Sequence, residues 1–187
     1  MDDGWWDRSN PGELRQGQLL ERFEMPVLRP LEDAHSGEDG RERVGVEIRE
    51  GRGIVLTQSC DLVSKDGPFV TVCRVYTAHE FAAEQDGYGF DPPTNGTRSK
   101  WEDIRRGKVV NAHLVRSPFA SPPLDPWSVL VVDFRQVLTI PRAAAAEQVT
   151  SETHRLRSPY LEHFSQAFAR SFMRVGLPSD LPSFKAR

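Results

Sequence analysis

The stretch of sequence that decides the fold reads Val129-Leu130-Val131-Val132-Asp133-Phe134-Arg135-Gln136-Val137-Leu138-Thr139-Ile140. β-Branched and aromatic residues dominate it, and neither glycine nor proline interrupts it. Such residues favour extended backbone because their side chains pack well on a pleated surface. This stretch is therefore predicted to be a long central strand.

Further strands are predicted upstream of this stretch. Val44, Val46 and Ile48 alternate with small or polar residues, which predicts a half-buried strand. Residues 25–30 contain two prolines and should also be extended. The remaining strand predictions cover residues 16–23, 54–59, 69–76 and 109–115.

Two helices accompany these strands. Ser99 is a candidate N-cap for a short helix over 100–107. Ser158 as N-cap, Pro159 at the first helical position and Gly176 after the end predict a second helix over 158–176. An apolar stripe at helical spacing marks the buried face of this second helix: Tyr160, Phe164, Ala167, Phe168, Phe172 and Val175. The expected fold class is α+β, mainly β.

The composition excludes several classes of protein. The chain has 187 residues and a net charge of −3, and its length corresponds to one domain. Its two cysteines are too few for a disulfide framework or for a zinc site of their own. No apolar run is long enough to cross a bilayer. Residues 1–6 lack the basic start and apolar run of a signal peptide, so a cytoplasmic protein is expected. Residues 100–187 hold 13 basic and 8 acidic side chains, and this excess suits a polyanionic partner.

Small polar residues form the end of the predicted strand 54–59 and continue beyond it, in the order Thr57-Gln58-Ser59-Cys60-Asp61-Leu62. Sites are often built at such a sheet end. Cys60 is a candidate nucleophile with His79 or His113 as base. The other interpretation is that Ser59 and Asp61 make turn hydrogen bonds while Cys60 packs as a small apolar residue.

The order of these segments is similar to that of the MazF/PemK toxins. It runs from a Gly-x-Leu opening strand, through Arg52-Gly53-Ile54-Val55-Leu56-Thr57-Gln58 and the strand 69–76, to 111–115 and 128–137. The resemblance spans 16–177 and implies an SH3-like β-barrel. Residues 1–15 are then an N-terminal extension, 16–142 the barrel with loop insertions at 31–50 and 78–108, and 158–176 the C-terminal helix.

The resemblance also implies an activity, cleavage of single-stranded RNA by its own 2′-OH without metal or cofactor. It places the catalytic arginine at Arg52 and the catalytic threonine at Thr77. A guanidinium can stabilise the doubly charged phosphorane that forms during such cleavage. Under this hypothesis four further residues bind the substrate: Gln58, Ser59, Asp61 and Arg74. A homodimer and an antitoxin are the implied protein partners.

The sequence departs from the family pattern in ways that favour an alternative. The family's Gly-Asp opening is Gly17-Gln18 here, and its Arg-Pro pair is Arg52-Gly53. The inserted loops border the expected groove. The alternative hypothesis is a catalytically inactive barrel that binds a protein or nucleic acid through loops 31–50 and 84–99.

Overall fold

The predicted central strand is β6 (Val129–Pro141), which is an interior strand of the larger sheet in the computed structural model and lies next to the edge strand. The structure describes residues 4–30, 44–64, 67–89, 94–120, 125 and 127–173. β6 pairs with β4 (Phe69–Thr77) on one side and with β5 (Ala112–Arg116) on the other. Its residues 130–134 are all buried, because both faces of the sheet are covered here.

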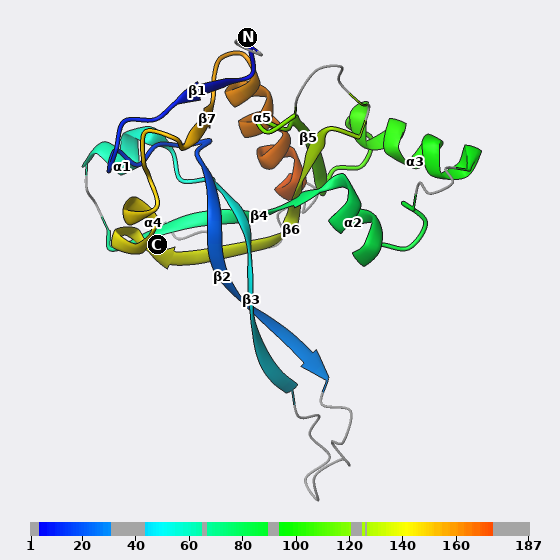
Figure 1. Ribbon diagram of the computed structural model, residues 1–187, viewed down its shortest axis with the longest axis horizontal. Coiled ribbons are helices and arrows are strands. Elements are labelled where there is room, and N and C mark those ends of the chain that lie inside the picture. Colours follow the sequence, from blue (N-terminus) through cyan, green and yellow to red (C-terminus); the bar gives the residue numbers. More distant parts are fainter. Residues whose placement is uncertain are drawn as a thin grey trace, which may run out of the picture.

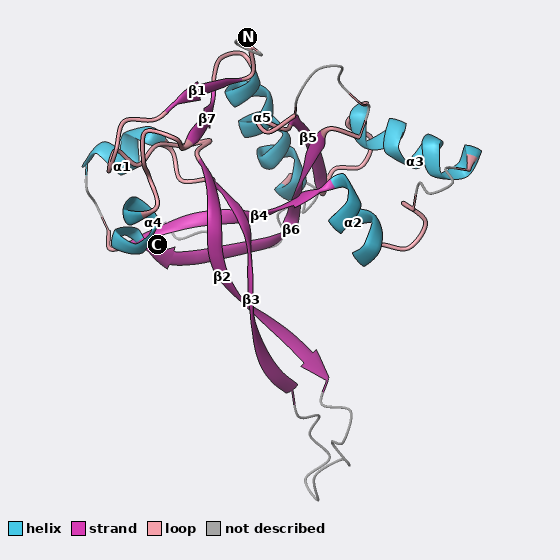
Figure 2. Ribbon diagram, viewed as in Figure 1, coloured by secondary structure: helices cyan, strands magenta, loops and turns pink. Residues whose placement is uncertain are grey.

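The fold is α+β, with two antiparallel sheets in the described part of the chain. The larger sheet has the order β2-β3-β4-β6-β5, with β2 at Leu19–Pro30 and β3 at Val44–Val55. The smaller sheet pairs β1 (Trp6–Arg8) with β7 (His154–Leu156). β2 and β5 are the edges of the larger sheet, so strand pairing does not close it into the barrel that the resemblance implies (Figure 2).

The helix α5 (Tyr160–Phe172) lies on one face of this sheet, over the core that contains Phe164. The prediction of a C-terminal helix is confirmed, but its N-cap is Pro159 rather than Ser158, and the Pro159 carbonyl accepts a hydrogen bond from the N–H of His163. Phe172 was expected on the buried face and is 58% exposed, because only the first part of the helix reaches the core. Val175 and Gly176 lie outside the described residues.

Helices also cover the opposite face of the sheet (Figure 1). α2 (Ala78–Glu84) and α3 (Asn95–Arg105) pack through Phe81, Trp101 and Ile104 onto Tyr76 and Val131. Two shorter helices, α1 (Ser59–Ser64) and α4 (Arg142–Glu147), pack on the same face toward the other end of β4. The predicted 78–108 insertion thus holds two helices, and α3 begins at the N-cap Thr94, five residues before Ser99.

β2 and β3 continue past the sheet as a two-stranded arm (Figure 1). Residues 44–50, assigned to a loop insertion, are the first part of β3, and residues 31–43 lie outside the described residues. The predicted alternation is there, but Val46 and Ile48 are 62% and 59% exposed. Among the described strands only β2 pairs with this part of β3, so no third described strand supports its apolar side chains.

The N-terminal extension is part of the folded body. β1 pairs with β7, and Trp6 is buried in the core under α5. The indole Nε1 of Trp6 donates to the carbonyl of Arg116 at the end of β5, at 2.8 Å. Trp5 stacks on Tyr160 of α5 with 3.7 Å between ring centroids. Both tryptophans therefore cover an edge of the core, as expected for aromatic residues in this position.

Candidate functional site

Thr77 is the last residue of β4 and the N-cap of α2. Its Oγ1 accepts a hydrogen bond from the backbone N–H of Glu80 at 3.1 Å, and its own N–H donates to Oε2 of Glu80 at 2.7 Å. This reciprocal pair is a capping box, which satisfies two backbone donors at a helix start. It fixes the side chains of Thr77 and Glu80 against each other.

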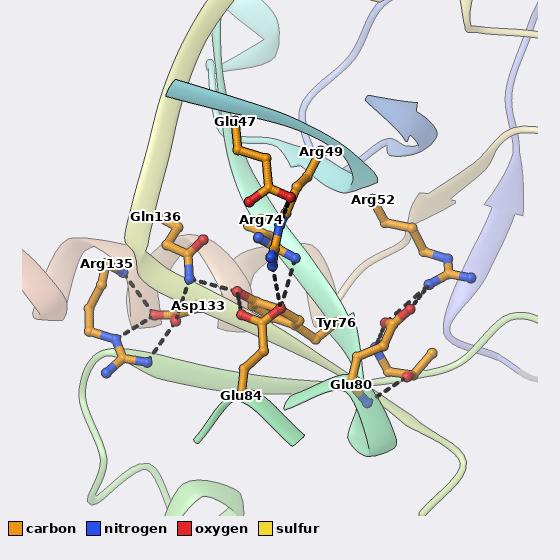
Figure 3. A network of polar contacts seen from close by, with 11 residues as sticks. Glu47, Arg49, Arg52, Arg74, Tyr76, Glu80, Glu84, Asp133, Arg135 and Gln136 are labelled. Atoms are coloured by element: carbon orange, nitrogen blue, oxygen red, sulfur yellow. Dashed lines mark hydrogen bonds and ion pairs between the residues drawn. The ribbon is translucent and has the colours of Figure 1, made fainter. Parts of the chain in front are cut away.

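Arg52 reaches the same carboxylate from the neighbouring strand. It lies in β3 opposite Val75 of β4, two residues before Thr77. Its Nη1 is 3.3 Å from both carboxylate oxygens of Glu80 (Figure 3). The Arg52 and Glu80 side chains are 31% and 51% exposed, so a ligand can reach them from solvent. The two residues that the resemblance picks out, Arg52 and Thr77, therefore meet at Glu80.

Glu80 is ionised at neutral pH. Burial raises its pKa, but hydrogen bonds from Thr77 and the charge of Arg52 outweigh this effect, so the pKa lies below its usual range. The sequence analysis did not single out Glu80. The signal was present as Thr77-Ala78-His79-Glu80, which has the Thr-x-x-Glu spacing of a capping box.

Arg74 lies nearby in β4 but is an internal residue rather than an exposed contact. It is buried, its Nη2 lies 3.1 Å from Oε1 of Glu84, and its guanidinium lies 4.3 Å from the ring centroid of Tyr76. Glu84 also accepts a hydrogen bond from the Tyr76 hydroxyl at 2.9 Å. Arg49 of β3 approaches Glu84 at 3.9 Å. Arg74 therefore anchors α2 to the sheet from inside.

The network continues through Tyr76 to β6 (Figure 3). Nε2 of Gln136 donates to the Tyr76 hydroxyl at 2.6 Å and to Oδ2 of Asp133 at 3.3 Å. Asp133 is fully buried and accepts two bonds from the Arg135 guanidinium, at 2.8 and 2.7 Å. Burial is the main cause that raises the pKa of Tyr76, which stays a neutral hydroxyl. This part of the network has a structural role, because each buried charge has an opposite charge beside it.

The other predicted substrate-binding residues lie at the opposite end of β4. Gln58 precedes α1, while Ser59 and Asp61 are in it, and this helix replaces the expected turn. Residues 56 and 57 hydrogen-bond to Thr71, six residues before Thr77. At about 3.3 Å per residue this separation is roughly 20 Å. The structure thus keeps Gln58, Ser59 and Asp61 apart from Thr77.

Cys60 is exposed in α1, and its Sγ donates to the side-chain oxygens of Gln58 and Asp61. His113 lies in β5 with its ring against Phe134 and Phe164 under α5. The structure does not bring Cys60 and His113 together. No grouping of three or more metal-ligating side chains occurs within the described ranges.

Comparisons with family models, curated proteins and solved structures give no match to this chain. Among the described residues, no helix has the length and apolar character needed to span a membrane.

Proposed function

We propose that the chain is a metal-independent endoribonuclease of the MazF/PemK type, which cleaves single-stranded RNA by attack of the ribose 2′-OH on the adjacent phosphate. One observation carries this proposal. Arg52 and Thr77, selected by the family resemblance, both contact Glu80, whose carboxylate is ionised and half-exposed: Arg52 and the Thr77 N–H bind the carboxylate, and the Thr77 hydroxyl accepts from the Glu80 amide. A cation, a hydroxyl and a base at one accessible point form a set that this reaction can use.

Each residue has a role in the proposed reaction. Glu80 accepts the proton of the 2′-OH as the 2′-oxygen forms a bond to phosphorus. Arg52 stabilises the charged phosphorane. Within the described part of the chain, Glu80 contacts only the Nη1 atom of this guanidinium, so the other nitrogens of Arg52 can face the phosphate. The Thr77 hydroxyl oxygen accepts a hydrogen bond from the Glu80 amide through a lone pair, so the O–H of Thr77 can donate to a phosphate oxygen. The bond to the 5′-oxygen then breaks, and this oxygen takes a proton from water. The products are a 2′,3′-cyclic phosphate and a 5′-hydroxyl end.

The proposal includes an SH3-like barrel. Two links between the sheets support it: a bridge from Gln18 to Arg155 beside β2, and the hydrogen bond from Trp6 of β1 to Arg116 of β5. With these links, the β1–β7 pair spans the distance between the two edges of the larger sheet. A homodimer and an antitoxin-like partner belong to the same hypothesis.

A binding module without catalysis is the second candidate. The ion pairs of α2 favour it, because Glu80 and Glu84 already neutralise Arg52 and Arg74. In this hypothesis α2 completes the fold, and the barrel holds a partner through its loops.

RNA cleavage by the purified protein separates the two functions. Wild type should produce 5′-hydroxyl ends from single-stranded RNA, and RNA with 2′-deoxyribose at the cleaved position should resist. Arg52→Gln should lower the rate by about 10²–10³-fold, and Glu80→Gln by about 10²–10⁴-fold. Arg49→Gln is the matched control, because Arg49 lies three residues away on β3 with an equally exposed side chain and should keep the activity.

The outcome is decisive in either direction. Loss of cleavage in Arg52→Gln and Glu80→Gln, with normal unfolding curves, supports the nuclease. A folded wild-type protein that cleaves no RNA contradicts it and favours the binding module.

A further inference from the structure

A second site lies at the free edge of β5, which pairs only with β6 among the described strands. Ser117 donates to Ser128, and Phe134 donates to Asn111, so the odd-numbered residues from 111 to 117 face β6. Hydrogen bonding alternates along an antiparallel strand. The N–H and C=O of Leu114 therefore point away from β6, as does the Arg116 carbonyl that Trp6 caps.

This edge opens into a cavity of about 720 Å³. All five residues of β5 line it, which places the strand edge rather than one face in the wall. The end of α3 and one side of α5 complete it, and Figure 1 shows β5 between these two helices. The volume lies within the range of sites for small molecules, about 300–1,000 Å³.

The lining is positively charged. Four arginines contribute to it, and no aspartate or glutamate does: Arg105, Arg106, Arg116 and Arg170. Glu102, outside the lining, pairs with both Arg105 and Arg106, so one carboxylate serves two guanidinium groups. The cavity therefore favours an anionic ligand, and arginine suits phosphate because its planar donors match two oxygens at once.

The rest of the wall is apolar or aromatic. Trp5 and Tyr160 line the cavity as a parallel stack, together with Val109, Ala167 and the aliphatic residues of β5. His113 is neutral at physiological pH, because burial, followed by the charges of His163 and Arg170, lowers its pKa to about 4. An anion that enters must therefore also carry an apolar, preferably planar, group.

We propose that this cavity binds a free nucleotide. The edge of its base pairs with the N–H and C=O of Leu114, an adjacent donor and acceptor that match the donor and acceptor on the edge of a nucleobase. Its phosphate binds the arginines, with Arg170 as the principal contact. This site goes beyond the proposed nuclease function and does not depend on it.

The site is separate from the Arg52 cluster. The strand register places Arg52, Val75, Val132 and His113 in one row across four strands. Three strand spacings separate Arg52 from His113, which is about 14 Å, and α5 packs over the residues between them. A variant at one site therefore leaves the contacts of the other intact.

Calorimetric titration of the full chain with AMP, GMP, CMP and UMP tests the proposal. At least one nucleotide should bind with a Kd below about 1 mM, at least about tenfold tighter than ribose 5-phosphate or inorganic phosphate, because these probes lack the base. Arg170→Gln should weaken binding about tenfold or more. Arg22→Gln, at an exposed arginine of β2 far from the cavity, is the matched control and should bind as wild type does.

Three results would overturn the proposal. One is the absence of binding by any mononucleotide to folded protein, and another is equal affinity in wild type and Arg170→Gln. The third is binding of a short RNA, but of no mononucleotide, in a manner that depends on Arg170; this would assign the cavity to the polymer. RNA cleavage by Arg170→Gln, measured in parallel, distinguishes failure of this site from failure of the nuclease.

Discussion

Replacing Thr77 separates its role in folding from its proposed role in catalysis. In Thr77→Ala, the bond from the Glu80 amide to Oγ1 is lost, while the backbone bond to the Glu80 carboxylate remains. Loss of a threonine N-cap costs about 1 kcal/mol. The larger losses seen at some caps are not expected, because the buried residues Ala78 and Phe81 hold α2 on the core independently of the cap.

Urea and thermal unfolding followed by circular dichroism measure this effect. A loss of about 1 kcal/mol lowers Tm by about 2–4 °C in a domain of this size. Thr77→Ser keeps the hydroxyl and should match wild type in both stability and RNA cleavage. Thr77→Asn keeps an N-cap oxygen but loses the hydroxyl, so it should have wild-type stability and cleave RNA at least about tenfold more slowly.

Two results would refute this reasoning. If Thr77→Ala is as stable as wild type, the capping box contributes nothing and the helix is held by packing alone. If Thr77→Asn cleaves RNA at the wild-type rate, the hydroxyl has no catalytic role and Thr77 is only a cap.

Three further predictions test the fold. Phe164→Ala should lower the free energy of unfolding, measured in urea, by about 3–5 kcal/mol, because Phe164 is fully buried. Phe172→Ala on the same helix should lower it by about 1 kcal/mol or less. Equal losses would contradict the position of α5. A thiol reagent should modify the exposed Cys60 in native protein but reach Cys73 only on unfolding, because burial raises the pKa of the Cys73 thiol; rapid modification of both would show that the core is open. The pKa of His113 is lowered to about 4 in the folded protein, so the unfolded chain binds more protons between about pH 6.5 and 4. The free energy of unfolding should therefore be complete above pH 6.5 and should fall through this window by at most about 1.4 kcal/mol per pH unit. His113→Leu should reduce this fall, and an unchanged slope would show that His113 is not its source.

The long strands and the C-terminal helix could be predicted because their signals are local. An uninterrupted run of β-favouring residues predicts β6, and aromatic residues at helical spacing predict α5. What covers each apolar face is a tertiary property. The alternation at Val46 and Ile48 therefore identified a strand without showing that it extends past the sheet, and the α5 stripe did not show where its contact with the core ends.

The candidate site could be predicted only in part, for the same reason. Arg52 and Thr77 were selected by the resemblance to a known family, and the carboxylate that joins them was missed although its spacing from Thr77 was visible in the sequence. Arg74 was assigned to substrate binding, but it is buried. Its burial depends on Glu84, whose position follows from α2 folding back onto the sheet. A short helix of seven residues has too weak a periodic signal to predict that placement.

The pairing of β1 with β7 has a consequence for the order of folding. Trp6 pairs with Leu156, so the chain between them must be synthesised before the first strand can find its partner. Contacts this far apart in sequence slow folding, because the long loop must close before they form. During synthesis, Trp5 and Trp6 therefore cannot make their contacts with residues 154–160 until that segment has emerged.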